Sequence, residues 1–187
     1  MEDFAPKPWI VEQDQMVADR RIFAVHLVRA RSQIRPGQAG EFVVLDAPDW
    51  VNVIALTPER EVVLVEQYRH GTRTITLELP GGMVDRGEDI VQAGVRELLE
   101  ETGFAGASVK LIGVVEPNPA FQNNRCGTVL VQNVHCVASQ DLDPNEEIRV
   151  RLEPLHRIPE LIRTGVITHS LVVAAFHHLT LLEPWTG

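Results

Sequence analysis

The chain has no long apolar run and little positive charge. None of its segments approaches the roughly 18–20 consecutive apolar residues that cross a bilayer, so we expect no membrane partner. Residues 1–19 are rich in acidic side chains and contain no apolar core, so we expect no signal peptide either. The 187 residues include 17 Lys and Arg against 26 Asp and Glu, a formal charge of −9. Non-specific binding to nucleic acid depends on a basic face, so we expect no nucleic-acid partner.

Cysteine is scarce as well. The two cysteines, Cys126 and Cys136, are not spaced as a C-x-x-C pair. This spacing excludes a disulfide framework and gives no support to a structural zinc site. We therefore expect two buried, unreactive thiols in a protein of the reducing cytoplasm.

The composition that remains is that of an ordinary globular protein, with 44% apolar and 23% charged residues. A turn-rich stretch at 46–49, Asp-Ala-Pro-Asp, separates two regions. Before it we expect strands at 22–31 and 41–46, a sheet so small that it should pack on the rest of the chain or on a second copy. After it, the pattern predicts an α+β order: strands at 51–56, 61–69, 75–79, 108–116, 128–138 and 148–153, and helices at 88–102, 158–163 and 170–182.

The helix predicted over 88–102 carries an unusual concentration of acid. Its segment 88–101, EDIVQAGVRELLEE, holds five acidic residues and one arginine. At about 100° per residue, Glu97, Glu100 and Glu101 share an arc of about 100° on one face, where like charges destabilise a helix. A bound Mg²⁺ or Mn²⁺ would relieve this repulsion, because hard divalent cations prefer oxygen ligands. A solvated acidic face is the alternative.

The residues around this helix favour the metal. From Gly82 the sequence reads GMVDRGEDIVQAGVRELLEETGF. It resembles the Nudix box of the Nudix hydrolases, G-x5-E-x7-R-E-U-x-E-E-x-G-U with U a bulky apolar residue, at every fixed position. The resemblance implies an α/β/α sandwich with a mixed sheet in residues 48–187. It also implies that residues 1–47 form a small antiparallel β-sheet for dimerisation, exchanged or shared between the protomers of a homodimer.

The resemblance also implies a role for each box residue. The expected structural residues of the box are Gly82, Glu88, Arg96, Leu98 and Gly103, with Glu88 and Arg96 close enough on the helix to pair. Two or three Mg²⁺ ions (Mn²⁺ would also serve) are expected per site. Their expected ligands are the main-chain carbonyl of Gly81 and the carboxylates of Glu97, Glu100, Glu101 and Glu146. The catalytic candidates are Glu146, then Glu147 from the same acidic loop, and Glu100 in support.

A second pattern concerns the substrate. Glu-Gln-Tyr-Arg-His at 66–70 and Leu-Glu-Leu-Pro-Gly-Gly at 77–82 resemble the ADP-ribose and nucleotide-sugar pyrophosphatase branch of the family. The resemblance implies a pyrophosphohydrolase that converts ADP-ribose, or a related nucleoside diphosphate sugar, into a nucleoside monophosphate and a sugar phosphate. The candidate substrate-binding residues are Arg69, Glu78, Trp9, Arg20, Arg29, Asn118 and Arg125.

The substrate pattern departs from this branch at two places. Gly81 stands where its ADP-ribose enzymes usually have alanine, and the segment 116–125, EPNPAFQNNR, replaces an expected Ser-Pro-Gly. A hydrolase that prefers GDP-mannose or another NDP-hexose is therefore an alternative, and a non-catalytic nucleotide sensor is a further one. The three C-terminal histidines, at 169, 177 and 178, are expected to be helix-surface or core residues.

Overall fold

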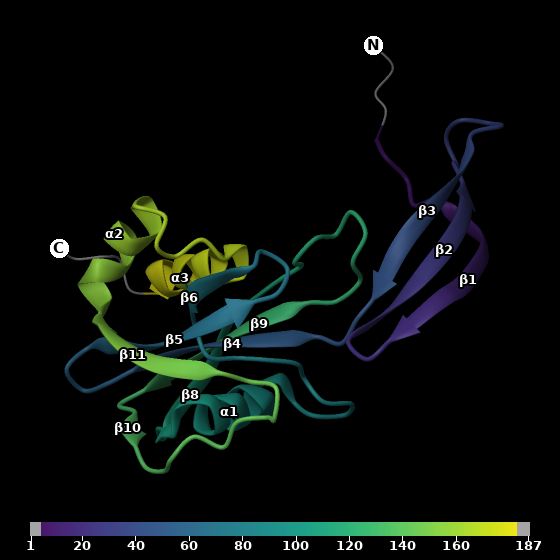
Figure 1. Cartoon of the computed structure of the whole chain (residues 1–187). Helices are drawn as coiled ribbons and strands as arrows, with labels where there is room; N and C mark the ends of the chain where they lie inside the picture. Colours follow the sequence, from purple (N-terminus) through teal and green to yellow (C-terminus); the bar gives the residue numbers. More distant parts are fainter. Residues whose placement is uncertain (1–4, 183–187) are drawn as a thin grey trace. The chain divides into compact units, whose positions relative to one another are not determined.

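The computed structural model describes residues 5–182, which form two compact units. The first unit contains the chain up to Pro48 together with the loop Glu116–Asn124, and the second contains the remainder. The strands of the first unit are β1 (Ile10–Arg20), β2 (Phe23–Arg31) and β3 (Ala39–Asp46) (Figure 1).

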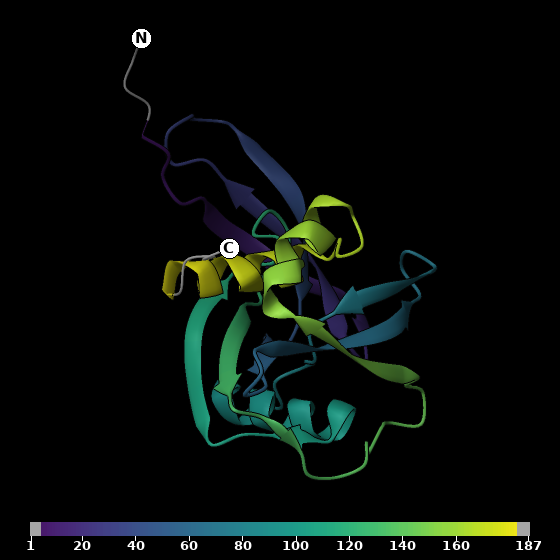
Figure 2. The same cartoon turned by 90° about the vertical axis from the view of Figure 1, so that its left-hand side faces the viewer.

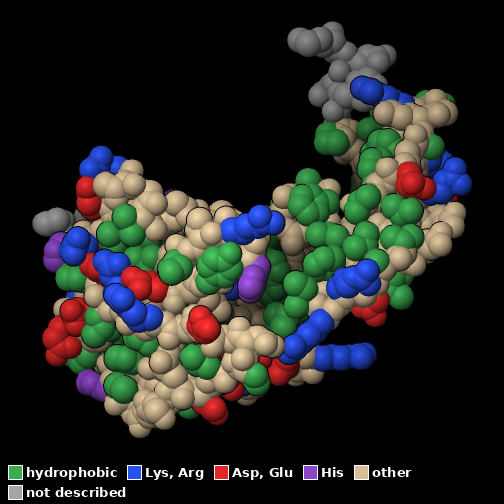
Figure 3. Space-filling model, in the orientation of Figure 1, with side chains coloured by type: hydrophobic (Ala, Val, Ile, Leu, Met, Phe, Trp, Pro, Cys, Tyr) green, Lys and Arg blue, Asp and Glu red, His purple; other side chains and the backbone are tan. Residues whose placement is uncertain are grey.

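The first unit is an antiparallel sheet in the order β1-β2-β3. The sequence predicted β2 and β3 but not β1, which pairs with β2 from Ile10↔Arg31 to Arg20↔Phe23. Two register shifts interrupt this pairing, so β1 has no regular alternation of apolar and polar residues that would reveal a strand. Hydrophobic side chains gather over this sheet in Figure 3. The large exposed ones are Trp9, Val11, Met16, Val17, Ile22, Phe42 and Val43.

The loop 116–124 is held to the end of β3 by its amide groups. Leu45 N donates to the Phe121 carbonyl at 2.7 Å, and Asn123 Nδ2 donates to Asp46 Oδ1 at 2.7 Å. Asn124 Nδ2 donates to the Pro48 carbonyl at 3.0 Å. The asparagines at 123 and 124 therefore hold this loop against the chain at 46–48.

The second unit is built on a mixed sheet in the order β11-β5-β4-β9-β8, with β6 beside β5. Strands β4 and β9 run parallel, and the other pairs are antiparallel. The mixed sheet expected from the sequence is therefore confirmed. Its strands are β4 (Trp50–Leu56), β5 (Glu61–Arg69), β6 (Thr74–Glu78), β8 (Ser108–Val115), β9 (Cys126–Gln132) and β11 (Ile148–Pro154).

Helices cover both faces of this sheet, as Figures 1 and 2 show. Helix α1 (Ile90–Thr102) packs on one face, where Val53, Leu98 and Val129 share a buried core. The helices α2 (Ile158–Arg163) and α3 (Ser170–Leu182), preceded by the 3-10 turn Leu155–Arg157, pack on the other. The result is the predicted α/β/α sandwich. No helix within residues 5–182 combines the length and apolar character needed to span a membrane.

One predicted strand is two separate elements. The chain leaves β9 at Asn133, whose φ of 54° breaks the extended conformation. It then forms β10 (His135–Cys136), which pairs with the short β7 (Phe104–Ala105) in a separate sheet. The expectation of two buried thiols was therefore wrong for Cys136, because this short strand leaves it exposed. Cys126 is buried, and burial, together with the charge of Asp49, raises the pKa of its thiol to about 12.

Candidate active site

The approach to the box glycine is fixed by the central strand of the sheet. The carbonyls of Pro80 and Gly82 accept from the N–H groups of Val53 and Val51 at 2.8 and 2.9 Å. A Cβ on Gly81 would lie 2.0 Å from the Val51 carbonyl oxygen, so only glycine fits against β4 here. This contact requires glycine at position 81 in this chain.

Helix α1 begins later than the sequence suggested. Its N-cap is Asp89, whose Oδ1 accepts from Val91 N at 2.9 Å, so the helix starts at Ile90 rather than directly after Gly87. It ends as predicted at Gly103, which has φ 74° and donates its N–H to the Leu99 carbonyl at 2.8 Å. These two caps set the position of the acidic face.

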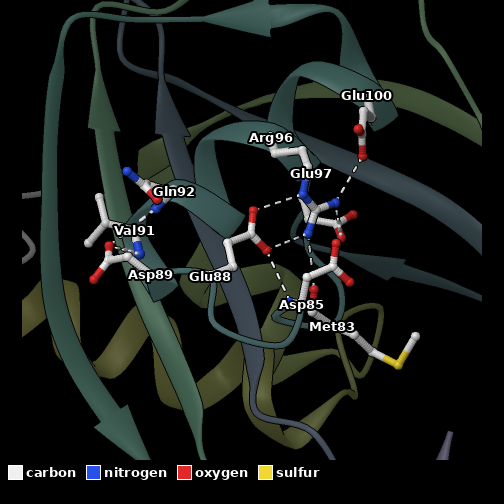
Figure 4. A network of polar contacts seen from close by, with 9 residues as sticks. All are labelled: Met83, Asp85, Glu88, Asp89, Val91, Gln92, Arg96, Glu97 and Glu100. Atoms are coloured by element: carbon white, nitrogen blue, oxygen red, sulfur yellow. Dashed lines mark hydrogen bonds and ion pairs between the residues drawn. The ribbon is translucent and has the colours of Figure 1, made fainter.

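Arg96 is the centre of the polar network in Figure 4. Its Nε and NH2 donate to the two oxygens of Glu88, each at 3.0 Å, which is the expected pair. Its NH1 donates to Glu97 Oε1 at 2.9 Å and to Glu100 Oε2 at 3.0 Å, and NH2 also reaches the Met83 carbonyl at 3.1 Å. The hydrogen bonds to Glu88 lower the pKa of that carboxyl and raise the pKa of Arg96.

Because of this network, the crowded carboxylates are less repulsive than their spacing implies. The guanidinium of Arg96 donates hydrogen bonds to both Glu97 and Glu100, so part of the charge of these two carboxylates is compensated within the helix. Within residues 5–182, no three His, Cys, Asp or Glu side chains are gathered closely enough to hold a metal ion. The acidic face is present as predicted, and Arg96 provides part of the charge compensation that the sequence assigned to metal ions alone.

Glu101 is the acid that Arg96 leaves uncompensated. Its side chain is buried, and its Oε2 accepts from Gly81 N at 2.9 Å. Its pKa is raised to about 8, chiefly by burial; the hydrogen bond from Gly81 opposes this rise, and the charges of Glu97 and Glu146 add to it. Burial also raises the pKa of Glu97. The chemistry of these donors suits a divalent cation, because a hard cation would stabilise buried carboxylate oxygens that repel one another, once the side chains had turned toward it.

The late acidic loop contributes one of its two glutamates to this environment. Glu146 is half-buried in a turn, where its N–H donates to the Asp143 carbonyl at 2.9 Å. Its charge acts on Glu97, on Glu101 and on Arg69. Glu147 is exposed. Of the two candidates, Glu146 is therefore the one the fold brings to the carboxylates of α1.

Arg69 and Glu78 form the second cluster of predicted residues. Arg69 Nε and NH2 donate to the two oxygens of Glu78 at 2.9 and 2.8 Å, and Thr76 Oγ1 donates to Oε1 at 2.6 Å. Glu78 is almost wholly buried. Burial would raise its pKa, but the bonds from Arg69 and Thr76 outweigh that effect and lower it. The pair fixes the guanidinium on the side where Glu101 and Glu146 act on it.

The sequence reasoning missed His169. Its ring Nδ1 accepts from Leu171 N at 3.2 Å at the start of α3, and its Nε2 lies 4.0 Å from Glu78 Oε2. The sequence places no carboxylate at ligand spacing from this histidine, and Glu78 comes near it only because the fold brings together residues distant in the sequence. The only local signal was its position directly before the apolar helix at 170–182, where a capping residue is needed.

Of the remaining substrate candidates, one lies in the second unit and the others in the first. Arg125 donates from NH2 to Asp49 Oδ2 at 2.8 Å, so its side chain is committed to an ion pair in the second unit. The other candidates all belong to the first unit, where Trp9 packs edge-on against Phe42 with 5.4 Å between ring centroids. These candidates are Trp9, Arg20, Arg29 and Asn118.

Comparison with known proteins agrees with this fold. A family model for the NUDIX domain matches residues 46–176. The ADP-ribose pyrophosphatase of Bacillus subtilis (strain 168) is 23% identical over 175 residues, covering 91% of this chain and 95% of that protein. The methanol dehydrogenase activator of Bacillus methanolicus is 30% identical over 175 residues, with the same coverage of each chain.

Among solved structures, an ADP compounds hydrolase has the same fold. It superposes with a TM-score of 0.85 at 19% sequence identity, covering 98% of this chain and 100% of that chain. The chain therefore belongs to the Nudix family of hydrolases, as its box predicted. The expected enzyme class, a Nudix pyrophosphohydrolase, is confirmed with it.

Proposed function

We propose that this protein hydrolyses the pyrophosphate bond of ADP-ribose, or of a related nucleoside diphosphate sugar, in a Mg²⁺-dependent reaction. The products would be a nucleoside monophosphate and a sugar phosphate. The observation that carries the proposal is the buried Glu101 carboxylate, bonded to Gly81 N and facing the charges of Glu97 and Glu146. The similarity to an ADP-ribose pyrophosphatase over most of both chains supports the substrate class.

Two or three Mg²⁺ ions, or Mn²⁺ in their place, would be held by oxygen ligands alone. The ligands in this proposal are the Gly81 carbonyl and the carboxylates of Glu97, Glu100, Glu101 and Glu146. Bound there, such ions neutralise a diphosphate, polarise it and lower the pKa of a bound water. To become ligands, Glu97 and Glu100 would give up their bonds to Arg96 NH1, while Arg96 stays anchored by Glu88.

The residues of the chain then divide the remaining work. Glu146 accepts the proton of the attacking water, because it is the late-loop carboxylate that is half-buried beside α1. Arg69, oriented by the bidentate bond to Glu78, binds a phosphate oxygen of the substrate. Gly81 positions Glu101 through its N–H.

The identity of the sugar and of the base in the substrate has an alternative. GDP-mannose or another NDP-hexose would use the same diphosphate chemistry. The activator name of the Bacillus methanolicus relative describes an effect on another enzyme and does not choose between these substrates. Trp9, Arg20, Arg29 and Asn118 of the first unit are proposed to bind the base or the sugar, because they offer ring, cationic and amide groups.

The proposal includes a homodimer formed through the first unit. Its sheet leaves apolar side chains such as Val11, Met16 and Phe42 exposed, and small sheets need such a face covered. In the proposed dimer, this sheet could also be exchanged between protomers, since exchange would cover the same apolar side chains. Both cysteines are free, which fits a reducing cytoplasm. Sedimentation that finds only monomer at micromolar concentration would refute the dimer.

A substrate panel tests the function directly. The full chain is incubated with Mg²⁺ and, separately, ADP-ribose, ADP-glucose, GDP-mannose, a dinucleotide or an NTP, and the released monophosphate is measured. We expect AMP from ADP-ribose, and no turnover after metal is removed with EDTA. GMP release from GDP-mannose at a higher kcat/KM than AMP release from ADP-ribose would select the alternative. Inertness toward the whole panel would overturn the proposal.

A further inference from the structure

The ring of His169 is held in one orientation and one protonation pattern. The residue directly precedes α3, its carbonyl accepts from Val173 N at 3.1 Å, and its Nδ1 accepts from Leu171 N at 3.2 Å. A ring nitrogen that accepts a hydrogen bond carries no proton itself. The neutral ring must therefore carry its proton on Nε2, which makes that atom a fixed hydrogen-bond donor.

This donor has no acceptor within the described residues. Its nearest carboxylate oxygen, Glu78 Oε2, is 4.0 Å away, which is too far for a hydrogen bond. The side chain is 34% exposed, so the N–H is open to a ligand rather than enclosed in the core. The cap thus accounts for one ring nitrogen, and the other is unused.

Arg69 lies against the same carboxylate oxygen. Its NH2 donates to Glu78 Oε2 at 2.8 Å, so the guanidinium and the imidazole both lie within 4.0 Å of one buried oxygen. The Arg69 side chain is 43% exposed, and its fork toward Glu78 occupies only Nε and one hydrogen of NH2. Two neighbouring groups, both donors and neither able to accept on the open side, are suited to an acceptor-only partner such as a phosphate oxygen. A sugar hydroxyl, which also donates, suits them less.

We infer that His169 is a substrate-binding residue that donates from Nε2 to a phosphate oxygen of the nucleoside diphosphate sugar, beside Arg69. The inference rests on the proposed function and adds a contact that the box and the substrate pattern do not contain. In this inference the start of α3 is part of the diphosphate site, because the His169 side chain both caps the helix and binds the substrate.

Two substitutions separate the cap from the donor. His169→Asn keeps an acceptor near the position of Nδ1, since asparagine is among the best N-cap residues, but has no group that reaches the position of Nε2. His169→Gln keeps an N–H at the reach of Nε2 but loses the acceptor close to the backbone. A residue that only caps α3 tolerates Asn and not Gln, whereas a substrate donor tolerates Gln and not Asn.

The readouts are the Tm, kcat and KM for ADP-ribose with Mg²⁺, and the Kd of α,β-methylene ADP-ribose, which is bound but not cleaved. For His169→Asn we expect an unchanged Tm, kcat/KM lower by roughly ten- to hundredfold, as for a lost hydrogen bond to a charged group, and a weaker Kd for the analogue. For His169→Gln we expect a lower Tm with kcat/KM and Kd close to wild type.

The opposite pattern overturns the assignment. If His169→Asn cleaves ADP-ribose and binds the analogue like wild type, His169 only caps the helix, and the proposed function stands unaffected. If wild type neither binds the analogue nor cleaves any nucleotide of the panel, the proposed function and this inference both fail. The two failures are therefore distinguished by the wild-type measurement alone.

Discussion

Both oxygens of the Glu88 carboxylate accept from one guanidinium, Oε1 from Arg96 Nε and Oε2 from Arg96 NH2, each at 3.0 Å. The same arginine also binds Glu97 and Glu100, the acids proposed to bind metal. Without Glu88, these two acids would be the carboxylates that hold the Arg96 side chain in place. Glu88→Gln should therefore lower the free energy of unfolding by roughly 1–3 kcal/mol, as for a hydrogen bond to a charged group. Urea denaturation at pH 7 measures this change.

The control for Glu88→Gln is a substitution in a similar Glu–Arg ion pair that is exposed to solvent. Glu160 and Arg163 on α2 are joined by two hydrogen bonds, at 2.6 and 2.8 Å, but both side chains are exposed. Exposed ion pairs contribute little to stability, so Glu160→Gln should leave the urea midpoint unchanged. Equal effects of the two substitutions would show that the Arg96 network has no special structural role.

Gly103 and Gly165 share one backbone conformation in different surroundings. Both have φ 74°, but a Cβ on Gly103 would lie 2.1 Å from the Ala138 carbonyl oxygen, whereas Gly165 has nothing within 4 Å. Gly165→Ala should cost roughly 1–2 kcal/mol for the left-handed conformation alone. Gly103→Ala should cost roughly 1–3 kcal/mol more, because the backbone that follows β10 must move. Equal losses in thermal or urea unfolding would contradict the contact at the end of α1.

The parts of this site that the sequence predicted are those fixed by local geometry. Glu88 and Arg96 lie on one face of the helix because of their spacing, and Gly103 ends the helix because its left-handed conformation favours glycine. The strands of the central sheet were also predicted, because nearly continuous apolar runs such as Val62–Val65 are buried on both faces.

The parts that the sequence did not predict depend on contacts between distant segments. His169 lies near Glu78 only because β6 and the start of α3 meet beside the sheet. Strand β1 pairs with β2 through two register shifts, and its exposed side chains mix apolar and polar residues without regular alternation, so they give no strand pattern. The role of Arg96 as a shared partner of three acids depends on rotamers, which helical spacing alone does not determine.

His178 should make stability depend on pH. Its ring lies against the backbone of Gly113, with Nδ1 3.3 Å from Thr128 Oγ1, and burial, followed by the charge of His177, lowers its pKa. As the pH falls, the histidine of the unfolded chain is therefore protonated before that of the folded chain. The contribution of neutral His178 to the free energy of unfolding is complete above about pH 6.5, the ordinary pKa of histidine. It is lost as the pH falls below that value.

Two variants test the assignment to His178. The difference in unfolding free energy between wild type and His178→Asn should shrink as the pH is lowered from 8 to 5. His177→Asn removes only the second cause, so it should move the midpoint of the pH profile toward the ordinary histidine value. Urea unfolding at each pH gives these profiles. Parallel curves for wild type and His178→Asn would show that His178 does not cause the pH dependence of stability.

Glu101→Gln should separate activity from stability. The substitution keeps the shape of the side chain and removes a buried carboxyl whose ionised form Arg96 does not stabilise. We expect turnover of ADP-ribose to fall by at least roughly a hundredfold, because several kcal/mol of charge stabilisation would depend on the bound metal. Without metal, the variant should unfold at the same Tm as wild type or higher, and the rise in Tm on adding Mg²⁺ should disappear. Full activity would remove Glu101 from the proposed ligands.

Glu146 and Glu147 are neighbours in the sequence that the fold places differently, which makes them a matched pair. Glu146 is half-buried and its charge acts on Glu97, Glu101 and Arg69, while Glu147 is exposed. Glu146→Gln should lower kcat by roughly 10²- to 10⁴-fold, the usual contribution of a general base, and Glu147→Gln should remain close to wild type.

A pH profile of kcat, together with the Kd for Mn²⁺ from calorimetry, resolves which role Glu146 has. If it is the base, Glu146→Gln should abolish the acidic limb of the profile and keep the Mn²⁺ affinity. If it is mainly a ligand, the affinity falls with the activity. Because both side chains lie on one loop, a general distortion of that loop would impair both variants equally. An inactive Glu147→Gln beside an active Glu146→Gln would reverse the assignment.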